Sequence, residues 1–410
     1  MNNTKKLDIL ENPYNEKLVP LGEIESRITR LRRHMEEQGL EALLILHRPD
    51  YFYFSGTSQN SILFIAADND PILFVKRDLD RARRESPLPV VHPFRTFSDL
   101  VGPIRDYHGN LPSLIGTELD ILPAALYLRL RETFGKPEFQ NASPVIMNCR
   151  MKKSPFEIEQ IRKAAGIGNE LFEAGRNHLK PGVSEIEFAA LLENEAKKRG
   201  HEGLIRMRGL NIEGYAWQVL SGPSGSLLSE ADTPAGGQGL SPAFPMGPGH
   251  RKIQPNEPVF VDFPICYNGY LADQARMYCI GDMPEKFVKA YQFCRDIQDG
   301  LLERIRPGIQ CADLFSLTID MADAAGYKDQ FLGPKGKKSK FIGHGLGLEA
   351  NESPAIAFGQ KQQLEEHMVL AIEPKIVFEN EGMAGIENIF LVTGDGCERL
   401  SDLSEDIICV

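Results

Sequence analysis

Four carboxylates and one imidazole, each beside a short apolar run, most constrain what this chain can form. They are Asp262, Asp273, His344, Glu373 and Glu387. An ionised carboxylate that is buried unpaired in such a run is costly, and a bound cation removes that cost. Carboxylate oxygen with one histidine nitrogen suits Mn, Co, Fe or Zn, whereas all-oxygen ligation suits Mg or Ca. Five ligands exceed what one catalytic ion usually takes, so the sequence predicts two divalent metal ions that share bridging carboxylates.

The spacing of the two aspartates predicts a hairpin between them. Asp262 follows the β-branched and aromatic run 259–261, and Asn268-Gly269 lies between Asp262 and Asp273. Asn-Gly between apolar runs is a strong hairpin signal, so the two carboxylates are expected roughly opposite one another. Any one of these acids alone reads as an ordinary strand-end or surface residue, but all five in this order do not.

The same five positions resemble the pita-bread metalloenzymes, which include aminopeptidase P, prolidase, methionine aminopeptidase and creatinase. The motifs that carry the resemblance are VDF at 261–263, ADQAR at 272–276, GHGLG at 343–347, IEP at 372–374 and IEN at 386–388. The resemblance implies an α/β (α+β) architecture, with an N-terminal creatinase-like accessory domain over 1–148 and a pita-bread catalytic domain over 149–410. It also implies a homodimer, because the accessory domain of such proteins commonly covers the partner's active site.

The resemblance assigns roles to the metal ligands. Asp262 would bind one ion, His344 and Glu373 the other, and Asp273 and Glu387 would bridge. A water shared by two cations becomes a nucleophile near neutral pH, and Glu373 would take its proton and pass it to the leaving nitrogen. Arg276, three residues after Asp273, is a candidate for orienting a ligand carboxylate, with a structural ion pair as the alternative.

Three departures from the family pattern bear on the substrate. Peptidase members carry a histidine where this chain has Pro245, and His250 lies five residues further on. Asn351 stands where a second family histidine follows the GHG motif, and Gly385 stands where relatives tend to carry arginine. Asn351 can donate a hydrogen bond but cannot transfer a proton at neutral pH. His250 and Asn351 are therefore candidate catalytic residues, each with a purely structural alternative.

The sequence consequently predicts a metallohydrolase, in first place a peptidase of the Xaa-Pro dipeptidase or aminopeptidase P type that cleaves short peptides. The alternative is a non-peptidase enzyme of the same fold, a hydrolase or lyase acting on a small C–N or C–S substrate. A non-catalytic binding protein is the third reading, which the intact ligands disfavour. The Gly-, Pro- and Ser-rich stretch 221–251 is expected to be a long loop or bulged entry that contributes to binding, with a surface excursion as the alternative.

Local patterns define the elements expected around this site. Residues 22–38 have helical apolar spacing, and strands are expected at 43–46, 61–67 and 71–76. Helices alternating with strands up to about residue 145 indicate a small α/β domain. Ser154 and Ser184, each followed by a glutamate three residues later, have capping-box spacing and predict two helix starts.

Composition narrows the partners and the compartment. The chain has 410 residues and a net charge of −11, which argues against nucleic acid as a partner. It has no apolar run long enough for a signal peptide or a membrane span. Its seven cysteines are scattered and lack a CxxC motif, so free thiols in a reducing cytoplasm are expected.

Overall fold

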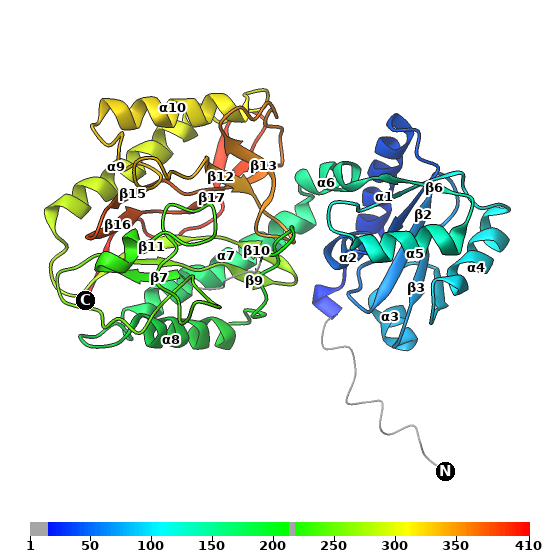
Figure 1. Ribbon diagram of the computed structural model, residues 1–410, viewed down its shortest axis with the longest axis horizontal. Coiled ribbons are helices and arrows are strands. Elements are labelled where there is room, and N and C mark those ends of the chain that lie inside the picture. Colours follow the sequence, from blue (N-terminus) through cyan, green and yellow to red (C-terminus); the bar gives the residue numbers. More distant parts are fainter. Residues whose placement is uncertain (1–14, 213–217) are drawn as a thin grey trace, which may run out of the picture. The chain divides into compact units, whose positions relative to one another are not determined.

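The computed structural model describes residues 15–212 and 218–410, so most of the N-terminal stretch inspected for a signal peptide lies outside the described residues. The chain divides into two compact units, one ending at Arg150 and the other beginning at Met151 (Figure 1). The domain boundary expected after residue 148 falls inside helix α6 (Ser143–Met151). Within the described residues, no helix has both the length and the apolar content needed to cross a membrane.

The first unit is built on one six-stranded sheet with the order β4-β3-β2-β1-β5-β6. The strands are β1 (Ala42–Ile45), β2 (Ser61–Ala66), β3 (Ile72–Val75), β4 (Val90–Pro93), β5 (Leu114–Thr117) and β6 (Glu138–Asn141). Besides a short 3-10 turn at Asn15–Lys17, the helices are α1 (Leu21–Glu37), α2 (Arg48–Ser55), α3 (Leu79–Glu85), α4 (Ser98–His108), α5 (Ala124–Phe134) and α6. Every residue of β1, β2 and β3 is buried, so both faces of the sheet are covered.

The apolar residues that predict the first helix are buried in the first unit. Ile24, Ile28, Leu31 and Met35 of α1 are all buried. The chain reverses between β2 and β3 at Asn69, whose φ of 67° is the left-handed conformation that asparagine tolerates. These elements and the mixed helix and sheet content confirm the α/β class.

Within the described part of the second unit, four helices flank the strands: α7 (Pro155–Gly175), α8 (Glu185–Lys198), α9 (Glu285–Leu302) and α10 (Cys311–Ala324). Ser154 and Ser184 form the expected capping boxes with Glu157 and Glu187 at the starts of α7 and α8. In Figure 1 the strands lie between the pair α7–α8 and the pair α9–α10. The unit thus repeats one plan, two helices followed by a sheet, which sequence inspection does not reveal.

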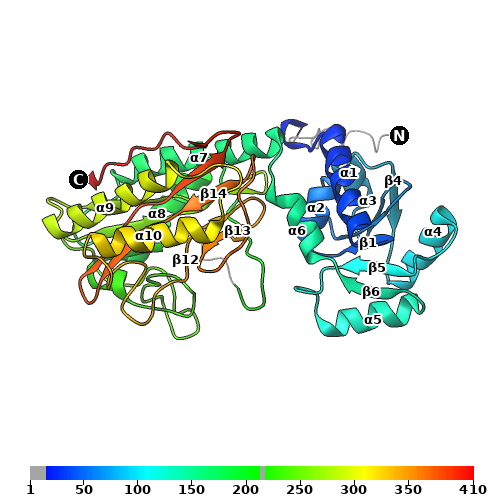
Figure 2. The ribbon, with the colours of Figure 1, turned by 90° about the horizontal axis from the view of Figure 1, so that it is seen from above.

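Two sheets carry the second unit, and in each a small antiparallel ribbon is inserted along the chain between two paired strands, β8 and β11 in the first and β14 and β17 in the second. The first has the order β19-β11-β8-β7 and the second β13-β12-β14-β17-β18, and the ribbons are β9–β10 and β15–β16. Their bounds are β7 (Gln218–Ser221), β8 (Val259–Asp262), β9 (Ile265–Tyr267), β10 (Tyr270–Ala272), β11 (Ala275–Cys279), β12 (Phe341–Gly345), β13 (Glu352–Ala357), β14 (Val369–Ile372), β15 (Lys375–Phe378), β16 (Gly382–Gly385), β17 (Asn388–Val392), β18 (Cys397–Arg399) and β19 (Ile408–Cys409). Helix α10 runs beside β12 and β13 in Figure 2.

The segment 221–251 is largely irregular, as expected. It begins with Ser221 at the end of β7 and a 3-10 turn at Gly222–Ser226, and Ser229 and Pro245 are then joined by a hydrogen bond from the serine hydroxyl. The rest of the segment consists of turns, bends, irregular backbone and two isolated bridges, Gly237 with Gly247 and Ser241 with Phe244. Its side chains at the cavity described below are therefore presented by loop backbone.

Candidate metal centre

The two aspartates come from one hairpin arrangement. Asp262 ends β8, which pairs with β11 so that Asp262 lies opposite Ala275. Between them, β9 and β10 turn at Asn268-Gly269, whose φ values of 50° and 79° fit the predicted tight hairpin. Asp273 stands between β10 and β11, so the hairpin returns it to the level of Asp262.

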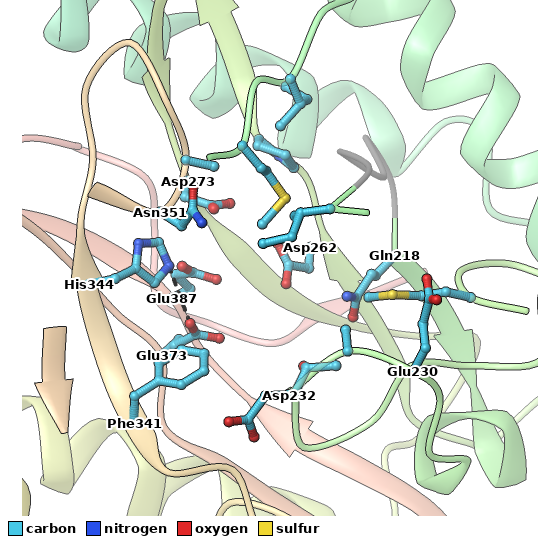
Figure 3. A pocket seen from close by; sticks show the side chains of 18 of the residues that line it. Gln218, Glu230, Asp232, Asp262, Asp273, Phe341, His344, Asn351, Glu373 and Glu387 are labelled. Atoms are coloured by element: carbon cyan, nitrogen blue, oxygen red, sulfur yellow. Dashed lines mark ion pairs between the residues drawn. The ribbon is translucent and has the colours of Figure 1, made fainter. Parts of the chain in front are cut away.

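The imidazole and the glutamates come from the second sheet. His344 lies in β12 opposite Ala371 of β14, and Glu373 follows β14 directly, its backbone N–H donating to the carbonyl of Ile342 at 2.9 Å. A backbone bridge between Glu387 and Ala275 then joins the two sheets. Sheet pairing therefore brings all five predicted ligands together, and Figure 3 shows their side chains turned toward one space.

One side of this cluster fits a divalent cation. Ligand atoms of Asp273, His344 and Glu387 all lie within 4.8 Å of one another. Oδ1 of Asp273 and Oε1 of Glu387 are buried and have no hydrogen-bond partner among the described residues. Buried acceptors are rarely left unsatisfied, and a carboxylate–imidazole set of this kind suits Mn, Co, Fe or Zn. A metal ion bound by these three residues would give the two unsatisfied carboxylate oxygens a partner.

The other side of the cluster contains a cation supplied by the chain itself. The ammonium of Lys375 forms an ion pair with Glu373 and lies 3.5 Å from Oδ2 of Asp262 and 4.0 Å from Oε2 of Glu387. The Lys375 side chain is only 2% exposed, and its Nζ lies 5.3 Å from the centre of the Phe260 ring. This lysine was not among the residues that the sequence pattern indicates.

Burial raises the pKa values of Asp262, Asp273 and Glu387, whereas the pKa of Glu373 is lowered. Burial, with the neighbouring Asp262 charge, raises the pKa of Asp273 to about 8, and burial with Asp273 beside it also raises the pKa of Glu387. Burial alone would raise the pKa of Glu373, but Lys375 and His344 outweigh it and lower that pKa to about 2. In the metal-free protein, one side therefore retains protons while Glu373 is ionised.

The cluster opens into a cavity of about 480 Å³, a size typical of sites for small molecules. Its apolar wall includes Ile205, Met207, Ile212, Met246 and Phe341. The 221–251 loop adds residues 230–233, including the carboxylates of Glu230 and Asp232 (Figure 3). The loop is therefore part of the cavity wall, as its predicted binding role requires.

Arg276 orients backbone rather than a ligand carboxylate. It is fully buried and donates to the carbonyl of Glu387 at 2.9 Å and to that of Ala275 at 2.8 Å. Its remaining hydrogen bonds reach Oδ1 of Asn388 and the carbonyls of Leu403 and Ser404. Arg276 thus holds the backbone at Glu387, directly before β17, and ties the C-terminal segment at Leu403 and Ser404 to this position.

The two candidate replacements for the family histidines differ in placement. Asn351 lines the cavity, but its amide exchanges hydrogen bonds with the backbone of Arg208, at 2.9 Å and 3.2 Å. His250 is exposed and is not one of the residues that line the cavity. The structure brings Asn351 to the site as a clamp on the 205–212 wall and leaves His250 outside.

Lys375 carries a signal that sequence inspection can use. It is a charged residue in the apolar run 375–378, immediately after the IEP motif, and it pairs across β15–β16 with Gly385. Gly385 is one of the three departures from the family pattern. Two unusual residues at partnered positions of one hairpin are informative together, although neither is so alone.

A catalytic half of two sheets flanked by helix pairs, holding clustered carboxylates and a histidine, defines a metal-dependent hydrolase class. The chain belongs to metallopeptidase family M24, whose model matches residues 159–394. A second family model, the creatinase/prolidase N-terminal domain, matches residues 27–152. The pita-bread resemblance and the metallopeptidase class predicted from the sequence are both confirmed.

Relatives span nearly the whole chain. An Xaa-Pro dipeptidase from Pyrococcus furiosus is 26% identical over 387 residues, which cover 94% of this chain and all of that protein. A protein from Staphylococcus epidermidis described as an uncharacterized peptidase is 27% identical over 92% of this chain and 99% of its own length. The crystal structure of an X-Pro aminopeptidase from Thermotoga maritima superposes with a TM-score of 0.78 at 26% identity, covering 93% of this chain and 99% of that one.

Proposed function

We propose that this metallopeptidase hydrolyses short peptides, with Xaa-Pro bonds as its preferred substrates, using two divalent ions of Mn, Co, Fe or Zn. The observation that carries the proposal is the convergence of all five ligand residues on a cavity of small-molecule size. Relatives named for Xaa-Pro cleavage, which match over more than nine-tenths of this chain, support the choice of substrate.

The ligands divide as the family resemblance implies. Asp262 would hold one ion, His344 and Glu373 the other, and Asp273 and Glu387 both. Divalent ions supply a nucleophile near neutral pH by lowering the pKa of bound water. Glu373, ionised and 3.4 Å from Nε2 of His344, would accept a proton and later release it to the leaving nitrogen.

The chain's remaining groups would position the substrate and the ligands. The apolar wall formed by 205–212 and Phe341 would receive side chains of the peptide, since apolar pockets with few polar groups bind by burial. Glu230 and Asp232 at the cavity would favour a substrate with a free amino group. Arg276 would keep Glu387 in place through its backbone.

We further propose that the protein is a homodimer and works in the cytoplasm. All seven cysteines are free thiols, five of them buried, which supports a reducing compartment. Support for the dimer comes from the family resemblance alone, and analytical ultracentrifugation of the full chain would test it.

One observation favours the runner-up, an enzyme that cleaves a small non-peptide C–N substrate. The Asn351 amide is already engaged by the backbone of Arg208, and His250 is exposed. A transition state would then lack two of the donors that peptidases of this family use, and such donors are each worth about 2.7–4 kcal/mol.

Turnover of a small panel by Mn- or Co-reconstituted protein distinguishes the two. The panel is Ala-Pro, Leu-Pro, Ala-Ala, a tripeptide with proline in second place, and creatine, with the Asp273→Ala variant as the metal-site control. Proline-dependent cleavage that is lost in Asp273→Ala is the expected result. Metal-loaded protein that cleaves creatine and none of the peptides would replace the peptidase proposal by the runner-up.

A further inference from the structure

The ammonium of Lys375 supplies positive charge to one side of the ligand cluster and not to the other. It lies within 4.0 Å of carboxylate oxygens of Asp262, Glu373 and Glu387. On the other side, Oδ1 of Asp273 and the second oxygen of Glu387 have no hydrogen-bond partner within the described ranges. The chain's own ammonium thus partners one part of the ligand cluster and does not reach these two oxygens of the other part.

This lysine is built into the fold. Lys375 begins β15 and pairs with Gly385 of β16. A Cβ atom on Gly385 would lie 2.8 Å from Cγ of Lys375 and 3.1 Å from the carbonyl oxygen of Pro374. The lysine stem therefore occupies space that only a glycine at 385 leaves open, and its burial holds the ammonium among the carboxylates.

An ammonium and a divalent ion that use the same oxygens exclude one another, because they repel and need the same lone pairs. Oε2 of Glu373 is engaged by Lys375, and Oδ2 of Asp262 lies 3.5 Å from it. A metal ion at Asp262 must displace the lysine, whereas an ion at Asp273, His344 and Glu387 satisfies free acceptors. That ion can also take Oε1 of Glu373, which lies toward His344 and is not the oxygen that Lys375 engages. Lysine has a flexible four-carbon stem, so the ammonium can leave these oxygens by a movement of the side chain.

We propose that Lys375 is a resident cation that competes with the second metal ion and makes the two positions fill in order. The first ion binds at Asp273, His344 and Glu387. The second binds near Asp262 only as the Lys375 ammonium withdraws. This inference rests on the two-ion centre of the proposed function, and it makes Lys375 a positioning residue that sets metal affinity.

The test is a titration of metal-free full-length protein with Co(II), followed by calorimetry and by visible absorption, with bound metal counted after desalting. Wild-type protein should retain one ion per chain and bind the second at least about 10-fold more weakly, a difference of about 1.4 kcal/mol. Lys375→Met keeps the length of the stem without its charge, and the second step should then tighten at least 10-fold while the first is unchanged.

Two further variants control the comparison. Lys375→Arg keeps the charge and should preserve the ordered filling. Lys153→Met removes a different buried lysine of the same unit, one that pairs with Glu352, and should leave the ratio of the two affinities as in wild-type protein. Lys375→Gln, checked by circular dichroism, replaces Lys375→Met if that variant does not fold.

Two equivalent ions in the wild-type protein, or an unchanged affinity ratio in folded Lys375→Met, would overturn the role of Lys375. Neither result depends on peptide turnover, so the peptidase proposal would survive it. Conversely, ordered filling that Lys375→Met abolishes would stand even if none of the panel peptides were cleaved. Failure to bind any Co(II) would refute the two-ion centre and this inference together.

Discussion

The two sides of the ligand cluster meet the same physical demand with different cations. On one side, Asp273 and Glu387 are buried beside His344, with raised pKa values and unsatisfied oxygens. On the other, Glu373 is ionised because Lys375 lies against it. Burying carboxylates is costly whichever way they are arranged. The difference teaches that a protein's own ammonium can stabilise part of a metal site, so a count of ligand residues does not by itself give the number of tightly held ions.

The largest effect should separate the two aspartates. Asp273→Asn removes a ligand from the side that has no internal cation, and we expect loss of the tightly held ion, with affinity lowered by more than about 100-fold, beyond the range for residues outside the ligand set. Asp262→Asn should leave that ion in place and weaken only the second. Elemental analysis after desalting measures both, with the exposed helical Asp320→Asn as the matched control.

Equal loss of both ions in Asp262→Asn and Asp273→Asn would remove the distinction between the two sides. It would mean that the ions bind only as a pair, whatever the position of Lys375.

Arg276 provides a test that should affect both sides alike. Arg276→Met leaves the carbonyls of Leu403 and Ser404 without this donor and removes one of the two donors to the carbonyl of Glu387. Buried groups deprived of a partner each cost about 1–3 kcal/mol. We expect the free energy of unfolding of metal-free protein to fall by about 3 kcal/mol in urea titrations. Both metal affinities should fall together, by about 10–100-fold.

An effect of Arg276→Met on one ion alone would contradict this account, because the arginine contacts no ligand carboxylate directly among its hydrogen bonds. Arg162→Met, which removes an exposed pair with Glu398, should change stability by no more than about 1 kcal/mol and serves as the control.

The pH dependence of metal binding should reveal the protonated side. The pKa of Asp273 is raised to about 8, so metal-free protein holds this proton below pH 8 and a metal ion must displace it. Affinity for the first ion should rise toward pH 8 by up to about 10-fold per pH unit for each proton that the ion displaces, and Glu387, whose pKa is also raised, adds to that rise. Calorimetry in buffers of different ionisation enthalpy counts the protons released.

The same shift fixes the sign of the stability effect. A carboxyl group whose folded-state pKa lies above its unfolded value stabilises the metal-free fold at low pH, and that contribution is lost as the pH rises through about 8. Metal-free protein should therefore lose stability between pH 6 and 9 more than Asp273→Asn does. A metal affinity that does not change between pH 6 and 8 would contradict the protonation of Asp273.

Several turns and helix starts could be predicted from the sequence because the local signals agree with the tertiary structure. The Asn268-Gly269 turn and the capping boxes at Ser154 and Ser184 are each determined by a few neighbouring residues. The five ligand positions could be proposed because buried charge beside apolar runs demands a partner. The occupant of the Asp262 side could not, since it depends on the register of β15 against β16, which brings Lys375 over Gly385.

Distance along the chain also explains why the placement of Asn351 and His250 could not be predicted. Asn351 stands in the right segment, but its amide is taken up by the backbone of Arg208, 143 residues earlier. His250 has suitable chemistry and lies in a loop that reaches the cavity, yet its own side chain is exposed. Both outcomes depend on how loops fold back, and loop paths leave little periodic trace in a sequence.

The smallest expected effect tests the fit of Lys375 to Gly385. A Cβ at 385 would press on Cγ of Lys375 and also approach Phe260 at 3.2 Å, and overpacking of this kind costs about 1–3 kcal/mol. Gly385→Ala should therefore destabilise the metal-free protein by about 1–3 kcal/mol. In the double variant, Lys375→Ala should relieve the part of that cost that comes from the lysine stem, with a coupling energy near 1 kcal/mol, since neighbouring residues typically couple by about 0.5–3 kcal/mol. Urea unfolding of the wild-type protein, the two single variants and the double variant gives the double-mutant cycle. Additive effects would mean that the lysine stem does not need the glycine, and the ammonium would then be free to leave the Asp262 side without any cost from the hairpin that carries it.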